Sequence, residues 1–214
     1  ICARLYYVIF SWDLYKDNLL DVFNTRKGGL AIYGGIIGAL VTAYIYARIK
    51  KIKILELFDF VVPYIVMAQG IGRWGNFVNQ EAYGVNTTLP WGMTSEKIRS
   101  ELSVLNIPGV NPDLPVHPTF LYESLWDLCV FLFLIWFRKR KKVSGEVFFL
   151  YAILYGAGRA FIEGLRTDSL MLGGVRISQL LSVVFIIAFG VVFYMRRRNY
   201  SMSVEEEVPV GHSE

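Results

Sequence analysis

Three clusters of basic residues each follow directly on an apolar stretch that is long enough to cross a lipid bilayer. The clusters are Arg-Ile-Lys-Lys-Ile-Lys at 48–53, Arg-Lys-Arg-Lys-Lys at 138–142 and three arginines at 196–198. Six apolar stretches can be read, at about 1–11, 30–48, 54–72, 117–137, 145–165 and 177–195. All but the first match the roughly 20 residues needed to cross a hydrocarbon core of about 30 Å. Basic clusters directly beside such stretches favour a membrane protein over a soluble one, whose basic clusters form solvated faces. The sequence therefore predicts an all-α polytopic membrane protein with about six spans in this chain.

The composition agrees with this class and excludes others. Hydrophobic residues make up 54% of the chain and charged residues 19%, against about 25% charged in soluble domains. Disorder, a disulfide scaffold and a collagen-like chain are excluded. Two cysteines, both in apolar stretches, and two histidines supply neither a thiolate nor a histidine metal site. Because the basic residues lie at the expected membrane edge, nucleic acid is not an expected partner.

The basic clusters also predict the orientation of the chain. They follow the second, fourth and sixth stretches, so all three lie on one side, which the positive-inside rule makes the cytoplasm. Arg4 is expected on that inner side too. Segments 12–29, 73–116 and 166–176 then face outward, with 73–116 forming a cap. We expect a membrane domain over 1–198 and a disordered cytoplasmic tail over 199–214.

The first stretch is too short to span alone. Residues 1–12 open on Ile, without the charged start and cleavage site of a signal peptide. We expect a chain that lacks its N-terminus, with one further span and seven in the full protein.

The densest polar feature lies at the outer end of the third stretch, over residues 72–84. It places Arg73, Asn76, Asn79 and Glu81 where a span would simply end, and Gly84 closes the motif. Glycines let a ligand or a second backbone approach closely, and Arg is suited to phosphate. A plain interfacial cap needs aromatic anchors but not these polar partners. The motif therefore predicts a binding site for a lipid phosphate at the outer headgroup level.

Three further polar elements fall at outward ends of spans. His117 precedes Pro118 and the fourth stretch, which continues through Tyr122 and Glu123. Each element also has a structural interpretation: a lone His at a helix start is more often structural than catalytic, and an Arg-Glu-Arg stripe can be a plain ion network. The other residues concerned are Arg159, Glu163 and Arg166 on one face of the fifth stretch, and Tyr33 among the glycines that open the second.

The remaining charged residues within spans are costly there, and such residues are functional or paired. Glu56 and Glu146 lie near span ends and are interpreted as interfacial residues, whereas Asp59 and Asp127 lie deeper.

These motifs together resemble the prolipoprotein diacylglyceryl transferase family. The pattern G-R-x-G-N-F-x-N-x-E-x-x-G is met from Gly72 to Gly84, and eight fixed positions in thirteen make a chance match improbable. Residues 2–4 (Cys-Ala-Arg) are similar to the family's G-A-R segment with Cys for Gly. The glycine-rich 29–38 stretch, the His-Pro-Thr-x-x-Tyr-Glu segment and the Arg159–Arg166 pattern follow in family order, so the resemblance covers residues 1 to about 195.

The sequence departs from the family pattern in two places. Family members carry a further N-terminal span with a Tyr, which this chain lacks. Some relatives have a catalytic His where Tyr33 stands, and here the Tyr resembles the Gram-positive branch.

The resemblance implies transfer of a diacylglyceryl group from phosphatidylglycerol to the lipobox cysteine thiol of a prolipoprotein, in the bacterial cell membrane. The products are a thioether and glycerol phosphate, and neither a metal nor an organic cofactor is required. Arg73 and Arg166 are expected to hold the phosphate, with Asn76, Asn79 and Glu81 orienting them. His117, Tyr33 or headgroup water could accept the thiol proton. The expected substrate-binding set is completed by Gly84, Tyr122, Glu123, Arg159 and Glu163.

Two other classes of function compete with this one. A lipid or solute transporter predicts inverted repeats and broken helices that meet at the midplane, whereas these polar motifs lie at one face. A non-catalytic scaffold for the secretion machinery leaves the Arg, Asn and Glu cluster and its glycines unexplained.

Overall fold

The protein forms two compact units, residues Ile1–Leu57 and Phe58–Glu214. The structure, a computed structural model, describes residues 1–207 except 17, 168–170 and 173–174. Described residues are mainly helical, and four helices are long and apolar enough to cross a membrane: Ile32–Lys50, Ile54–Asn79, Thr119–Arg138 and the Ile177–Ser203 part of the last helix. The chain is thus an all-α protein of the polytopic membrane class.

The first unit contains a short helix packed against a long one. Helix α1 (Cys2–Phe10) precedes three 3₁₀ turns, Trp12–Leu14, Leu19–Phe23 and Thr25–Lys27, and then α2 (Ile32–Lys50). Gly34 permits the contact, because an added Cβ would lie 2.9 Å from the Ala3 Cα and 2.5 Å from the Tyr6 Cβ. At about 1.5 Å per residue, the 9 residues of α1 are far shorter than a membrane crossing.

Arg4 lies near the start of α2 and not beside the basic residues 48–53, with which the sequence grouped it on one side. Its side chain binds the segment just before α2, the opposite end of that helix from the basic residues 48–53. The five N–H donors of a guanidinium can bind several carbonyl oxygens at once in this segment of short 3₁₀ turns and loops. Arg4 donates to the carbonyl oxygens of Asp21, Val22, Asn24, Gly28 and Gly29 at 2.6–3.1 Å.

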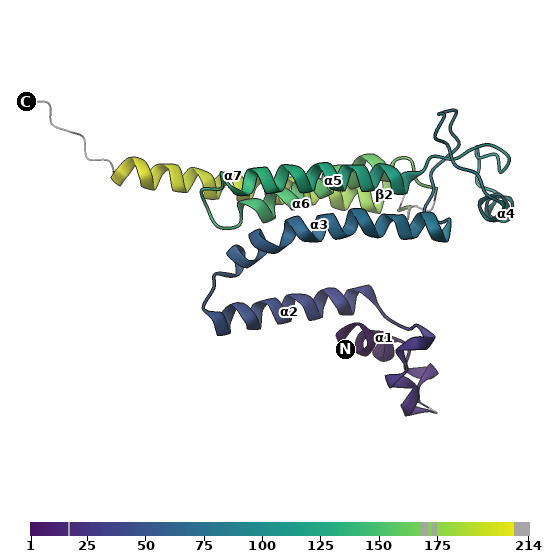
Figure 1. Ribbon diagram of the computed structural model, residues 1–214, viewed down its shortest axis with the longest axis horizontal. Helices are drawn as coiled ribbons and strands as arrows, with labels where there is room; N and C mark the ends of the chain where they lie inside the picture. Colours follow the sequence, from purple (N-terminus) through teal and green to yellow (C-terminus); the bar gives the residue numbers. More distant parts are fainter. Residues whose placement is uncertain (17, 168–170, 173–174, 208–214) are drawn as a thin grey trace, which may run out of the picture. The chain divides into compact units, whose positions relative to one another are not determined.

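The second unit is a helix bundle with a small cap at one end (Figure 1). Helix α3 (Ile54–Asn79), which begins in the first unit, packs with α5 (Thr119–Arg138) and α6 (Glu146–Glu163), and α6 packs with α7 (Ile177–Glu207). The bundle core is formed by Val62, Val66, Val130, Leu134 and Val147. A two-stranded ribbon, β1 (Met171–Leu172) and β2 (Val175–Arg176), joins α6 to α7.

The cap is the segment between α3 and α5. It contains α4 (Glu96–Leu105), which begins at Ser95, whose hydroxyl accepts from the Ile98 N–H at 3.1 Å. A core separate from that of the bundle holds the cap together, formed by Tyr83, Ile98, Leu102 and Val116. The cap is therefore a small folded segment with its own core at one end of the bundle.

Two helices extend beyond the boundaries expected from hydropathy. Helix α3 continues seven residues past 72 and ends at Asn79, where Gln80 takes a left-handed conformation (φ 53°) and Glu81 N–H binds the Asn76 carbonyl at 3.0 Å. Helix α7 continues to Glu207, so 199–207 is helical rather than disordered. Arg, Asn, Tyr and Ser interrupt a helix far less than Gly or Pro. Residues 208–214 lie outside the described part.

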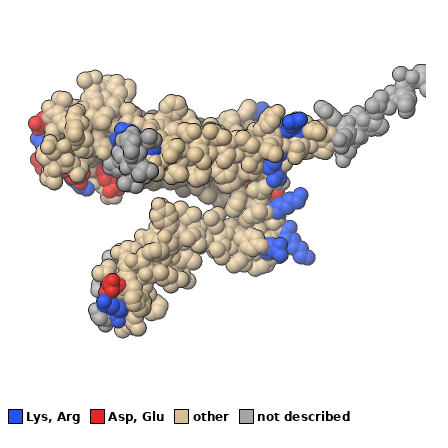
Figure 2. Space-filling view, turned by 180° about the vertical axis from the view of Figure 1, so that it is seen from behind, with Lys and Arg blue, Asp and Glu red and all other residues tan. Residues whose placement is uncertain are grey.

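An ion and hydrogen-bond cluster joins the helices at the end opposite the cap. Asp59 of α3 is 1% exposed and accepts from the N–H groups of Gly145 (2.7 Å) and Phe148 (2.9 Å), which caps the start of α6. Lys141 completes the cluster at 3.2 Å from Asp59. Glu146 lies at the first position of α6, near the span end as expected, and is buried in the protein beside Arg197 (3.9 Å). Lys and Arg side chains gather at this end of the helices (Figure 2).

Candidate active site

Glu123 is the centre of an arginine cluster at the cap end of the bundle. Its side chain is 6% exposed, and Arg73 Nη2 of α3 lies 2.5 Å from Glu123 Oε2. Arg159 Nη1 of α6 lies 3.5 Å from the same oxygen, and Arg166 Nη1 lies 3.5 Å from Oε1. One buried carboxylate therefore gathers three guanidinium groups from three separate segments.

A second carboxylate extends the cluster along α6. Glu163 Oε2 accepts from Arg159 Nη2 at 2.6 Å, and the Glu163 backbone carbonyl accepts from Arg176 of β2. Both acids are almost fully buried. Buried charges of this kind persist only when paired and hydrogen-bonded. The arrangement fixes Arg159 between two carboxylates and adds a fourth arginine.

Close helix packing sets the register of this cluster. Gly158 of α6 lies against the Trp126 ring of α5, leaving no room for a Cβ, and Trp126 Nε1 donates to the Leu154 carbonyl at 3.0 Å. Gly70 of α3 packs similarly, since an added Cβ would lie 3.2 Å from the Cβ of Asp127. These approaches bring the polar faces of α3, α5 and α6 together.

The remaining polar residues of the 72–84 motif form their own group at the end of α3. Glu81 Oε1 accepts from Asn76 Nδ2 at 3.0 Å and from Asn79 Nδ2 at 3.2 Å. These bonds link the last turn of α3 to the cap. Arg73 is instead oriented by Glu123, so the orienting role expected for the two asparagines and Glu81 is filled by a residue of α5.

Gly84 joins the cap to the arginine cluster. It forms an antiparallel bridge with Arg166, and its N–H donates to the His117 carbonyl at 2.9 Å. An added Cβ would lie 2.8 Å from both the His117 Cβ and the Leu165 carbonyl oxygen. Only glycine fits without a shift of one of these neighbours, so the spacing between Arg166 and His117 depends on it.

His117 belongs to a short hydrogen-bond chain. Tyr122 Oη lies 3.0 Å from His117 Nδ1 and accepts from Trp91 Nε1 at 2.9 Å. Because an indole N–H only donates, the phenol proton is available to His117. The sequence predicted His117 and Tyr122 as site residues but gave no signal for Trp91, which comes from a loop.

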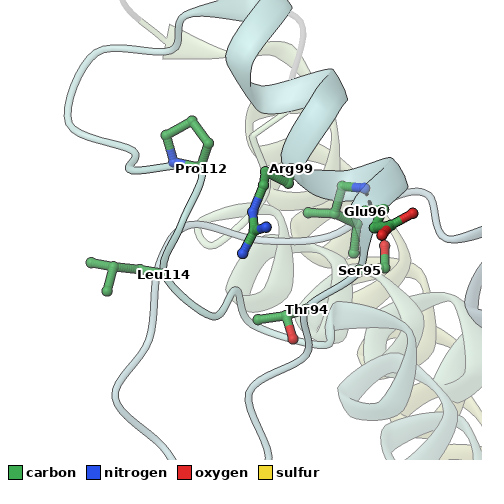
Figure 3. Close-up of a pocket in the computed structure, with 7 residues that line it drawn as sticks. Thr94, Ser95, Glu96, Arg99, Pro112 and Leu114 are labelled. Atoms are coloured by element: carbon green, nitrogen blue, oxygen red, sulfur yellow. Dashed lines mark hydrogen bonds between the residues drawn. The ribbon is translucent and has the colours of Figure 1, made fainter.

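Two pockets in the cap adjoin Leu114. One is a groove of about 440 Å³ formed by Asn86, Thr87, Thr88, Leu89, Leu114, Pro115 and His117. The other, of about 240 Å³ at the start of α4, includes Arg99 and Glu96 (Figure 3). Arg99 is already paired there, with Asp113 at 3.1 Å.

Tyr33 lies in the first unit, in the first turn of α2. Its side chain is 66% exposed, and its ring centroid is 6.4 Å from that of Tyr6. The cluster around Glu123 joins the second-unit residues Arg73, Arg159, Arg166, Glu123 and Glu163, whereas Tyr33 belongs to the first unit. Among the described residues no three His, Cys, Asp or Glu side chains could hold a metal ion.

Arg176 and Trp91 were missed by sequence reasoning for the same reason. Trp91 lies in a loop and Arg176 in the short strand β2, both outside any periodic pattern, and each reaches the site through tertiary packing. Arginine clusters of this kind are suited to oxyanions such as phosphate and carboxylate, whose oxygens accept from the planar guanidinium group. Fold and site together define a polytopic membrane protein with a buried cluster of arginines and carboxylates at one end of its helices.

Comparison with known proteins identifies the family. The Prolipoprotein diacylglyceryl transferase family profile matches residues 1–195. The chain is 47% identical over 208 residues to the phosphatidylglycerol–prolipoprotein diacylglyceryl transferase of Clostridioides difficile, covering 96% of this chain and 77% of that one. The enzymes of the same name from Finegoldia magna (48% over 206 residues, 96% and 76% covered) and Listeria welshimeri (48% over 197 residues, 92% and 70%) are similar. The chain belongs to this family of membrane transferases, which confirms the resemblance.

Proposed function

We propose that this protein transfers the diacylglyceryl group of phosphatidylglycerol to the lipobox cysteine thiol of a prolipoprotein. The similar enzymes carry both substrates in their names. The observation that carries the proposal is the contact of Glu123 with Arg73, Arg159 and Arg166, an anion site at one end of a membrane bundle.

The reaction is a displacement at a glycerol carbon. The cysteine thiolate attacks the carbon that bears the phosphate, a C–S bond forms, and the C–O bond to phosphate breaks. Glycerol phosphate leaves with the electron pair and with growing negative charge. Arg73 and Arg166 stabilise that charge more in the transition state than in the bound lipid, which accelerates the reaction.

Glu123 holds the arginines in place before the lipid arrives. Guanidinium groups fixed by a buried carboxylate require little reorganisation when phosphate enters. Arg159 and Glu163 hold the arginine cluster from α6 through their own ion pair. The connection between α3 and the cap is formed by Asn76, Asn79, Glu81 and Gly84. The thiol proton passes to one of three acceptors: His117, Tyr33 or headgroup water. Tyr122 orients His117.

The orientation follows from the charges at the two ends of the bundle. We place the basic residues 138–142 and 196–198 in the cytoplasm and the cap over 80–118 on the outer face. Helices α2, α3, α5, α6 and α7 then cross the membrane, one fewer than the six apolar stretches, because α1 has 9 residues. The end of α7 and the C-terminus are cytoplasmic.

The test is direct product detection. Purified protein is incubated with phosphatidylglycerol and a lipobox peptide, and the thioether peptide and glycerol phosphate are measured by mass spectrometry. We expect both products in equal amounts from the wild type, and none from a peptide with Ser for Cys. Arg166→Ala is expected to remain membrane-inserted and to lose activity by about 10²–10³-fold, the usual cost of losing one charge-stabilising donor. Lipid movement without the thioether product would contradict the proposal and favour transport.

A further inference from the structure

The 440 Å³ groove of the cap differs in character from the arginine cluster beside it. None of its seven lining residues is an acid, a lysine or an arginine. They combine two hydroxyls, a carboxamide and an imidazole with Leu89, Leu114 and Pro115. Its volume is within the range of about 300–1,000 Å³ typical of ligand sites. Such a lining suits neutral amide and short apolar groups and offers no cation to a phosphate.

One short segment connects the groove with the arginine cluster. Gly84 pairs with Arg166, the Val85 N–H donates to the Leu165 carbonyl at 2.9 Å, and Asn86 pairs with Val116. The next residues, 86–89, line the groove. A ligand that leaves the arginine cluster along this segment therefore enters the groove within a few residues.

The walls of the groove are held by hydrogen bonds rather than left as open loops. Asn86 Nδ2 donates to the Asn111 carbonyl at 2.9 Å, and its Oδ1 accepts from the Asn111 N–H at 2.6 Å. Thr87 N–H donates to the Pro115 carbonyl at 2.8 Å, and Thr87 Oγ1 accepts from the Leu89 N–H at 3.1 Å. A preformed groove binds a flexible chain at a lower entropy cost than a loop that must order.

We propose that this groove binds the uncharged polypeptide segment that directly follows the acceptor cysteine of the protein substrate. The inference rests on the proposed function, which brings the thiol to the arginine cluster. The chain that follows must leave on the cap side, because the membrane lies on the other. The groove is neutral and is joined to the cluster through residues 84–89, whereas the pocket on the other side of Leu114 is lined by the charged residues Glu96 and Arg99.

Charge swaps on both partners test the proposal. Three lipobox peptides extend four residues past the cysteine and carry Lys, Glu or Ser at the second of these positions. We expect Thr88→Asp to favour the Lys peptide over the Glu peptide, and Thr88→Lys to reverse that order. Each shift in kcat/KM is expected to be about two- to five-fold, the strength of an exposed ion pair. The same pair of substitutions at Leu114 is expected to act with the same signs, and carries the test if the Thr88 variants do not accumulate.

Val104→Asp and Val104→Lys are the matched controls. Val104 is 83% exposed on α4 and does not line the groove, so wild-type peptide preference is expected. If the Thr88 and Leu114 variants show peptide preferences no larger than those of the Val104 variants, the groove assignment is overturned. Thioether product from the peptide that keeps the cysteine and has Ser at the second position after it would still support the transferase. An altered KM for phosphatidylglycerol without any peptide preference would also overturn it and assign the groove to lipid. No product from any peptide with the wild type would overturn both proposals.

Discussion

Arg73 of α3 and Glu123 of α5 form a direct ion pair, with Nη2 and Oε2 2.5 Å apart and only 6% of the glutamate side chain exposed. The pair joins two helices that are separated in sequence by the whole cap. Because Arg159 and Arg166 contact the same carboxylate, Glu123 sets the spacing of the anion site. Under the proposed function, Glu123 positions the arginines for the lipid phosphate.

Replacing Glu123 by Gln is expected to lower kcat by about 10²–10³-fold, the range observed when one preorganised electrostatic contact is lost. The amide keeps the volume but no longer attracts three guanidinium groups. The measurement is thioether formation by purified protein, with KM for phosphatidylglycerol determined in parallel. Leu125→Ala, at a 53% exposed position of the same helix, is the control. Wild-type kcat in the Gln variant would remove Glu123 from its positioning role.

Gly84→Ala is expected to reduce activity and to lower the apparent Tm in detergent. The added Cβ would lie 2.8 Å from both His117 and Leu165 and 3.2 Å from the Thr119 Cγ2, so the cap must move away from Arg166. Overpacking of this kind typically costs about 1–3 kcal/mol. Gly190→Ala in α7, where no atom lies within 4 Å of the added Cβ, controls for the loss of glycine itself. Equal behaviour of the two variants would refute the close-approach explanation.

Asp59→Ala is expected to destabilise the protein without changing the chemistry. The substitution removes the acceptor for Gly145 and Phe148 and leaves Lys141 without this carboxylate. Breaking a buried charged pair typically costs about 3–5 kcal/mol. Thermal unfolding in detergent measures the loss, and kcat per folded molecule is expected to stay within a few-fold of wild type because Asp59 lies at the end opposite the arginine cluster. Asp13→Asn, an exposed residue paired only locally with Lys16, is the control. A normal Tm with lost kcat would contradict this assignment.

Tyr122→Phe tests the chain from Trp91 through Tyr122 to His117. The substitution removes the hydroxyl that lies 3.0 Å from His117 Nδ1, and we expect a fall in kcat/KM of about 10-fold, the low end of a hydrogen bond to a charged group (about 1.5 kcal/mol). Because coupled residues are non-additive, the same substitution is expected to have little effect in a His117→Gln background. Additive losses would show that the two residues act separately, and a His117→Gln variant within a few-fold of wild type would make His117 structural.

The sequence predicted the long helices better than their ends. Hydropathy located α2, α3, α5, α6 and α7, because each needs a long apolar surface. It stopped α3 seven residues early, since the polar turn from Arg73 to Asn79 faces other protein segments as well as solvent. The cap was predicted only as an outward region, because its core of Tyr83, Ile98, Leu102 and Val116 comes from short segments without a repeating pattern.

The sequence by itself determined the membrane-protein class, the family and the charged residues at the expected outward ends of the spans. Those properties depend on local composition and on motif spacing, which a single chain displays directly. The tertiary structure alone decided that Glu123 gathers Arg73, Arg159 and Arg166, that Asn76 and Asn79 bind Glu81 instead, and that Arg4 secures the loop before α2. Ion pairs and close approaches form between segments far apart in the chain, and which partner a guanidinium meets depends on how the helices pack.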